Sequence, residues 1–270
     1  MKITKITVQK KNKSRYNVYV DCGHGEEFGF AIDEDVYIKF GIEKGMELSA
    51  KEISELQSED EVRKGFNQAV NYLSYRMRSC QEIVEYLKKK EVPTSAIEAI
   101  MKRLQELKYI DDLEFAKMFI RSKVTTSQKG PKALEQELKL KGVSEAIIEK
   151  AILVYPQDQQ IESATKLAKK KAKQNQKLSE IAAKQKIGQL LKQKGFSWTI
   201  IEQAIEKASL QKDEQEEREA LDIQAQKAHR KYRKFSGWEY KQKMKQQLYR
   251  KGFSIELIDE WLNETEISDQ

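Results

Sequence analysis

Few residues in the chain have the types and spacing that catalysis requires. Asp111 and Asp112 are adjacent carboxylates, and paired carboxylates can act as acid and base. Glu114 follows Asp111 at capping-box spacing and no base or metal motif accompanies the pair, so helix capping is the stronger interpretation. The two histidines, His24 and His229, are far apart, and His229 falls on a solvated helix. We therefore expect a protein that is not an enzyme, with no catalytic, cofactor-binding or metal-binding residues.

Two other patterns have simple structural explanations. Gly23-His24-Gly25 could be taken for a phosphate-binding loop, but no strand-to-helix context surrounds it, so a hairpin turn is expected. Cys22 and Cys80 match no metal or redox spacing and are expected to be free thiols. The start lacks the apolar core of a signal peptide, and no apolar run approaches the ~18 residues of a membrane span. We expect a cytoplasmic protein with no membrane partner.

Charge is distributed unevenly along the 270 residues. The formal net charge is +7, with −3 in residues 1–60 and +10 in the remainder. Such asymmetry predicts a polyanionic partner for the C-terminal part. Hydrophobic residues make up 39% and charged residues 34%, against about 45–50% and about 25% in ordinary globular chains. This composition favours thin layers of helix over one thick core.

Ten basic residues form three clusters, which recur 27 to 39 residues beyond a shared turn described below. They are Arg121 and Lys123, then Lys169, Lys170, Lys171 and Lys173, then Arg230, Lys231, Arg233 and Lys234. Charge runs often only solvate a helix face. Repetition along an array is better explained by a long polyanion, so we predict that these residues bind nucleic acid or a nucleoprotein filament.

Other residues near the clusters have competing interpretations. The lysines that precede each turn are Lys90, Lys141, Lys194 and Lys251. Their place is largely explained by the attraction of a cation to a helix C-terminus, which contributes about 0.3–1 kcal/mol. Near the last cluster, Trp238 is predicted to pack between units, whereas Tyr232 is left open between packing and base stacking.

Residues 1–60 have the pattern of strands. Residues 3–8 and 16–20 alternate β-branched or aromatic residues with polar ones, and polar turns follow at 12–14 and 21–25. We expect a small antiparallel sheet of three or more strands that ends near Ser49. So short a module would be marginal by itself, so it should pack against its neighbour.

Beyond residue 60 one pattern occurs four times. Gly142, Gly195 and Gly252 each follow Lys and precede Val or Phe and then Ser, and Glu91 holds the same place in a first, degenerate copy. Counted from this position, apolar residues recur at −8, −4, +1, +6 and +10. The copies are 51, 53 and 57 residues apart. Tandem similarity at such a period is typical of repeat proteins.

The spacing predicts two helices joined by a tight turn. Residues at −8 and −4 share one face of the first helix, and those at +6 and +10 share one face of the second. Glycine at zero fits the left-handed residue that ends a helix, so Gly142, Gly195 and Gly252 are predicted structural turns. The serine after each turn can cap the next helix. A third helix follows at 109–121, 159–174 and 213–232.

The expected fold class is therefore mainly α. It consists of tandem three-helix repeats, helix-turn-helix-like, in an extended, curved array that is preceded by the small antiparallel β module. The predicted domains are the β-rich module 1–60, repeats 61–125, 126–176 and 177–234, and a partial repeat 235–270. We expect a monomer.

The chain resembles the RecX family of RecA regulators. The most specific residues are Tyr109 to Ala116 (YIDDLEFA), with the Lys-Gly-Val/Phe-Ser turns and the tandem organisation, and the first copy departs at Glu91 to Pro93. The resemblance implies a DNA-repair and homologous-recombination protein of the SOS response. Its partners would be the RecA filament and single-stranded, possibly double-stranded, DNA. It would restrain RecA recombinase and coprotease activity without a cofactor.

Two other functions are compatible with the pattern. A helix-turn-helix transcription regulator should carry base-reading polar residues at the start of each second helix. The residues there are Glu145-Ala146, Trp198-Thr199 and Ile255-Glu256, which are a poor set for this purpose. A structural adaptor without nucleic-acid contact would bind its partner with little dependence on salt.

Overall fold

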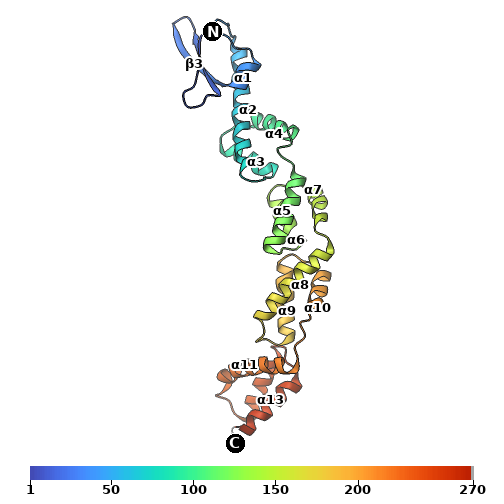
Figure 1. Ribbon diagram of the computed structural model, residues 1–270. Coiled ribbons are helices and arrows are strands. Elements are labelled where there is room, and N and C mark those ends of the chain that lie inside the picture. The colour runs from blue at the N-terminus through green and yellow to red at the C-terminus, as the bar shows by residue number, and fades with distance from the viewer. Residues whose placement is uncertain (269–270) are drawn as a thin grey trace. The chain divides into compact units, whose positions relative to one another are not determined.

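The computed structural model describes residues 1–268, and side chains to residue 264. It is mainly helical, with a small sheet at its N-terminal end (Figure 1), which confirms the expected fold class. Contacts divide the chain into two compact units. The first contains residues 1–116 and 139–147, and the second contains residues 117–138 and 148–270.

The N-terminal module is a three-stranded antiparallel sheet. Its strands are β1 (Lys2–Val8), β2 (Arg15–Asp21) and β3 (Glu26–Asp33), in the order β1-β2-β3. The predicted turn after β2 is a hairpin, in which the Asp21 carboxylate accepts hydrogen bonds from the amides of Gly23 and Gly25 at 2.7 and 3.1 Å. Gly23-His24-Gly25 is therefore no phosphate loop, because it joins two strands.

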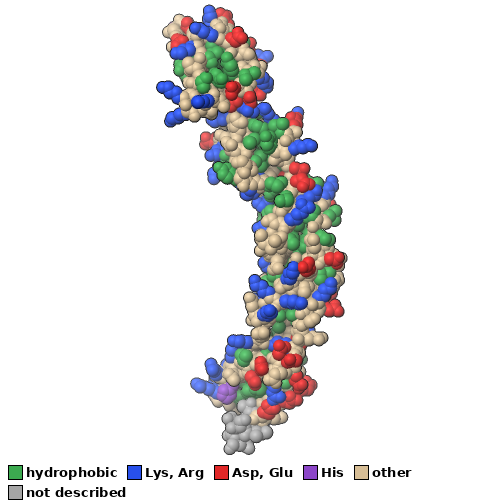
Figure 2. Space-filling view, in the orientation of Figure 1, with side chains coloured by type: hydrophobic (Ala, Val, Ile, Leu, Met, Phe, Trp, Pro, Cys, Tyr) green, Lys and Arg blue, Asp and Glu red, His purple; other side chains and the backbone are tan. Residues whose placement is uncertain are grey.

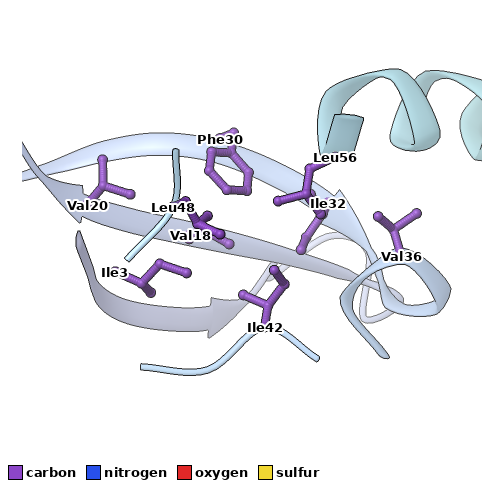
Figure 3. Close-up of a cluster of buried hydrophobic side chains, with 9 residues drawn as sticks. All are labelled: Ile3, Val18, Val20, Phe30, Ile32, Val36, Ile42, Leu48 and Leu56. Carbon is purple, nitrogen blue, oxygen red and sulfur yellow. The ribbon is translucent and has the colours of Figure 1, made fainter. Parts of the chain in front are cut away.

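One face of this sheet builds the module's core. Figure 3 shows the nine buried side chains, which are Ile3, Val18, Val20, Phe30, Ile32, Val36, Ile42, Leu48 and Leu56. Val36 belongs to α1 (Glu34–Lys39), a short helix that the sequence analysis did not predict because six residues show no clear helical period. Leu56 belongs to α2 (Ala50–Ser74), so the module shares its core with the next helix as expected.

A buried carboxylate adds a polar connection between the sheet and α2. Asp60 on α2 accepts a hydrogen bond from the Arg15 guanidinium at 2.6 Å and another from the Asp33 amide at 2.7 Å. Burying a charge is costly unless it is paired, and both partners come from the sheet. The contact therefore fixes α2 against strands β2 and β3.

The four predicted helix pairs are all present. They are α3 (Cys80–Lys89) with α4 (Thr94–Glu106), α6 (Pro131–Leu140) with α7 (Glu145–Ala151), α9 (Glu180–Gln193) with α10 (Trp198–Lys207), and α12 (Gly237–Tyr249) with α13 (Ile255–Ser268). A 3₁₀ turn, Ile152–Val154, continues α7. The long helices between pairs are α5 (Asp112–Ser127), α8 (Gln157–Gln174) and α11 (Glu214–Tyr232).

The apolar register explains the burial of these pairs. All eight residues at −8 and −4, from Ile83 to Leu248, are completely buried. Those at +6 are also buried. At +10 the first three copies are only half-buried, and the more deeply buried residue lies one position earlier, as at Ile100 and Ala204. Positions +9 and +10 straddle the centre of the face, because a helix turns every 3.6 residues.

The glycine turns have a second function beyond ending a helix. Gly142, Gly195 and Gly252 have φ of 75°, 90° and 87°. Lys194 and Gly195 accept hydrogen bonds from the amides of Gly130 and Lys132, at the start of α6, at 2.8 and 3.1 Å. A Cβ on Gly195 would lie 2.4 Å from the Ala133 nitrogen. Each such turn thus docks against the first helix of the preceding pair.

The same docking occurs on both sides of this copy. Ser79 Oγ at the start of α3 donates to Lys141 O at 2.7 Å, and Ser179 Oγ at the start of α9 donates to Lys251 O at 2.5 Å. Glu91 also has a positive φ, 61°, but its side chain is exposed. No helix pair precedes α3 among residues 1–268, which explains why this turn tolerates a side chain.

Carboxylates from the long helices cap the first helix of two pairs. Asp112 accepts a hydrogen bond from the Cys80 amide at 2.8 Å, and Glu217 accepts one from the Glu180 amide at 3.0 Å. These amides belong to the first helical residue, which has no partner within its own helix. The corresponding residue of α6 is Pro131, which has no N–H to satisfy.

The packing groups three of the helices that precede a pair with the pair that follows. Helix α2 contacts α3 and α4, α8 contacts α9 and α10, and α11 contacts α12 and α13. The predicted boundaries at 125, 176 and 234 place each long helix after its pair, because the amphipathic pattern does not specify which neighbour it faces. The domain boundaries stay a prediction, and residues 269 and 270 of the last one lie outside the described residues.

Glu82 predicts a dependence of stability on pH in the first unit. Burial alone would raise its pKa, but hydrogen bonds from Arg76, Lys141 and the Ser79 amide hold the pKa at about 2. The stabilisation is present above the ordinary pKa of 4.5 and is lost as the pH falls toward 2.

We expect about 1–2 kcal/mol of stability to disappear over that interval, a value reduced for partial exposure. The melting temperature of wild type and Glu82→Gln, measured from neutral pH to about pH 2, tests this. The two curves should converge at low pH, and parallel curves would contradict the assignment.

Candidate functional site

The residues whose types could support catalysis or metal binding make structural contacts instead. Asp111 accepts hydrogen bonds from the amides of Leu113 and Glu114 at the start of α5, which confirms helix capping. The Nδ1 atom of His229, on the exposed side of α11, lies 2.8 Å from the Tyr240 hydroxyl. Burial raises the pKa of the Cys80 thiol to about 12, so it stays protonated. Residues 1–268 contain no His, Cys, Asp and Glu cluster arranged to hold a metal ion.

Three of the four lysines that precede the turns are engaged with neighbouring elements. Lys141 Nζ lies 3.0 Å from Glu82. Lys194 Nζ donates to the Ser127 carbonyl at 3.3 Å, and Lys251 Nζ donates to Gln224 at 2.5 Å. The recurrence of these three therefore reflects docking as well as the favourable end of a helix, whereas Lys90 in the first copy is exposed.

The first basic cluster lies on the second half of α5. Arg121 is exposed. Lys123 is half-buried, with its Nζ 3.9 Å from Glu137 and 5.4 Å from the centre of the Phe119 ring. Arg121 is thus the more available of the two cations.

The second cluster ends α8. Lys169, Lys170 and Lys173 are exposed, whereas Lys171 is half-buried and donates to Gln174 at 3.2 Å. Residues four apart share a helix face, so Lys169 and Lys173 lie in one row and Lys171 points elsewhere. Of the four predicted lysines of this cluster, therefore, only Lys169 and Lys173 are shown to share one face of α8.

The third cluster surrounds the end of α11. Arg230, Lys231, Arg233 and Lys234 are all exposed, and Lys231 Nζ lies 5.1 Å from the centre of the Tyr232 ring. In the last three helices, Figure 2 shows Lys and Arg side chains gathered on the left and Asp and Glu side chains on the right. On the face that Figure 2 shows, the positive side chains of this part therefore gather on one side.

The aromatic residues near this cluster differ from expectation in one respect. Tyr232 is half-buried against the core of the last three helices and its hydroxyl donates to Gln247 at 3.3 Å, so it packs. Trp238 is 75% exposed, so the prediction that it packs between units is wrong. It lies in the first turn of α12, where the face toward the core begins only with later residues such as Met244.

An aromatic stack on the first unit was missed by the sequence analysis. The Arg78 guanidinium lies 3.6 Å from the centre of the Tyr72 ring, and this ring stacks on Tyr86 at 3.9 Å with planes 3° apart. Nearby Tyr75 is 85% exposed. The available signal was the run YLSYRMR at 72–78, which combines two tyrosines with two arginines.

The starts of the second helices do not form a base-reading surface. Glu145 pairs with Lys139, and Trp198 and Ile255 are 66% and 53% exposed. Ile255 has no polar group with which to read a base edge, and the Glu145 carboxylate is already paired with Lys139. The positions therefore add no support for a helix-turn-helix regulator.

Four family models match the chain in consecutive segments. The one described as "Regulatory protein RecX N-terminal domain" matches residues 1–49. The first three-helix domain of RecX matches residues 66–104 and the second matches 111–152. The third matches twice, at 157–205 and 215–262. This chain belongs to the RecX family.

Similar proteins agree with this assignment. The regulatory protein RecX of Bacillus cytotoxicus is 43% identical over 260 residues, which are 96% of both chains. That of Bacillus licheniformis is 45% identical over 262 residues, 97% of this chain and 98% of the relative.

Solved RecX structures are similar as well. A crystal structure of regulatory protein RecX is 36% identical and has a TM-score of 0.67, covering 76% of this chain and 98% of the other. RecX from Lactobacillus salivarius is 35% identical with a TM-score of 0.54, covering 56% and 99%. The two Bacillus relatives and the first of these structures are named as regulatory proteins.

None of the helices over residues 1–268 combines the length and apolarity that crossing a bilayer requires.

Proposed function

We propose that this RecX-family chain binds the RecA–single-stranded DNA filament and restrains the recombinase and coprotease activities of RecA. Membership of a family of regulatory proteins is the observation that carries the proposal. The chain acts as a stoichiometric ligand, as a monomer in the cytoplasm, without a cofactor.

The basic clusters support binding to such a filament. Arg121, Lys169, Lys170, Lys173 and the four cations at the end of α11 are exposed, and they recur with the repeats rather than converging on one pocket. Cations distributed along tandem units suit a long polyanion, because each phosphate contact releases counterions independently of base sequence.

Strand exchange by RecA tests the proposal. Added in stoichiometric amounts to filaments, the chain is expected to reduce the yield of exchanged strands and the cleavage of a coprotease substrate. Unchanged activity at a stoichiometric excess would overturn the proposal. Retention of one duplex sequence without any effect on RecA would instead support a transcription regulator.

A further inference from the structure

A groove in the second unit combines exposed cations with an unsatisfied buried amide. It lies between the end of α8, helix α9, the connection from α10 to α11, and α11 itself, with a cavity volume of about 520 Å³. The half-buried apolar side chains that line it, called its floor below, are Leu210 from the connection between α10 and α11 and Ile223 from α11. Ligand sites of about 300–1,000 Å³ accept small molecules, so this groove has room for one nucleotide but not for a folded element.

One wall of the groove is positively charged. Lys169, Lys173 and Lys177 line it, and their ammonium groups make no ion pair or hydrogen bond within the described part of the chain. Lys212 also lines the groove, but its Nζ donates to the carbonyls of Gln176 and Leu178 at 2.6 and 2.7 Å. Lys212 therefore holds the loop, while the other three are available to an anion.

Asn175 supplies a second, independent indication of a ligand. Its residue is only 9% exposed and lines the groove, yet its Nδ2 group has no hydrogen-bond partner among the described residues. Its backbone is satisfied, since its amide donates to Ala172 and its carbonyl accepts from Leu178. A buried donor without a partner is unfavourable, so an acceptor supplied by a ligand would relieve this cost.

The acidic part of the lining determines which ligand fits. Glu216 and Glu219 on α11 also line the groove. An acidic peptide would present carboxylates to these glutamates as well as to the lysines and be repelled by the glutamates. A nucleotide carries its phosphate at one end and amino donors on its base, which carboxylates can accept. Asn175 is the C-cap of α8, and the C-terminus of a helix carries partial negative charge. The ligand group that accepts a hydrogen bond from Asn175 should therefore be neutral, like a base acceptor, and not an anion.

We infer that this groove binds one nucleotide of single-stranded DNA. Lys169 and Lys173 contact the phosphate, the base lies on the apolar floor, and the buried Asn175 side chain turns toward the groove so that its Nδ2 donates to a base acceptor. The inference rests on the proposed function, because it identifies which of the predicted cations contact DNA. It also adds Asn175, which charge alone does not identify.

Two double variants in the second unit test the assignment of the phosphate. Lys169→Ala with Lys173→Ala removes two groove cations, and Lys186→Ala with Lys192→Ala removes two exposed lysines of α9 that do not line the groove and belong to none of the basic clusters. Fluorescence anisotropy with a fluorescein-labelled mixed-sequence single strand measures the affinity of each full-length chain. The groove pair should weaken binding by about tenfold and lower the salt slope by about 1.4, and the control pair by less than about threefold. Equal losses would overturn the inference.

Asn175→Ala tests the contact with the base. Its melting temperature should equal or exceed that of wild type, because the amide has no partner to lose. The variant should bind the mixed-sequence strand less tightly than wild type does, and it should bind an abasic strand of equal length as tightly as wild type does. Equal affinity of wild type for abasic and base-bearing strands would overturn the inference, and so would a variant that binds as wild type does.

RecA assays separate failure of the groove from failure of the proposed function. If both double variants bind single strands equally while wild type still inhibits strand exchange, the groove assignment is wrong and the proposed function stands. If wild type has no effect on RecA, and the groove double variant but not the control double variant has a lower affinity for DNA, the proposed function is wrong and the groove assignment is supported. If the groove pair alone loses binding to RecA in the absence of DNA, the ligand is a protein and the inference is overturned.

Discussion

Gly195→Val is expected to lower the free energy of unfolding by about 2–5 kcal/mol. Two costs combine at this turn. The backbone has φ of 90°, where a β-branched side chain is strained, and the new Cβ would meet Ala133 backbone and side chain at 2.4 and 2.7 Å. Circular dichroism during thermal or urea denaturation of the full chain measures the loss.

Glu91→Gly is the matched control at the same position of the first copy. Its φ of 61° is already left-handed, but the side chain is exposed and no preceding helix pair lies against it. Glycine should leave stability unchanged or raise it by up to about 1 kcal/mol. If Gly195→Val melted at the same temperature as wild type, this result would contradict the docking of the turn onto α6.

Replacing Arg230, Lys231, Arg233 and Lys234 together with alanine is expected to weaken binding to single-stranded DNA by about a hundredfold at low salt. Four lost phosphate contacts would lower the salt slope by up to about 2.8. The melting temperature should change little, because all four side chains are exposed and alanine is favourable at the two positions inside α11, Arg230 and Lys231. Anisotropy titrations at several salt concentrations measure both quantities.

A control with the same change in net charge uses the N-terminal module. Lys10, Lys11, Lys13 and Lys44 are exposed and lie in the part of the chain with a net charge of −3. Their replacement by alanine should weaken binding by less than about threefold, since no contact is lost. Comparable losses in the two variants would show that binding depends on overall charge and not on the end of α11.

The helix pairs could be predicted because their information is local. Residues at −8 and −4 repeat on one helix face, so burial of Leu138 or Leu191 follows from spacing alone. The strands were equally accessible through alternation. The six-residue α1 was not, because it is too short to show a period.

Features that depend on contacts between distant residues could not be predicted. The sequence shows that Gly195 can end a helix, but not that it lies against Ala133, 62 residues earlier. The same limit explains Lys141, whose position before a turn suggests capping although its partner is Glu82. Which pair a long helix faces is likewise a matter of tertiary packing.

Of the candidate site, only the positions of its charged residues could be predicted from the sequence. Runs of lysine on α8 and α11 are visible in the sequence, but their division into free and engaged side chains requires the structure, as Lys171 and Lys212 illustrate. Asn175 belongs to a groove that three separate segments build, and no local pattern marks it.

Co-sedimentation with preassembled RecA–single-stranded DNA filaments tests most directly whether this chain is a filament ligand. The experiment measures the fraction of chain that pellets with filaments as protein and salt concentrations are varied. The account predicts saturable binding that weakens steeply with salt, because exposed cations carry much of the interaction. A chain that stays in the supernatant, or that pellets equally at low and high salt, would contradict it.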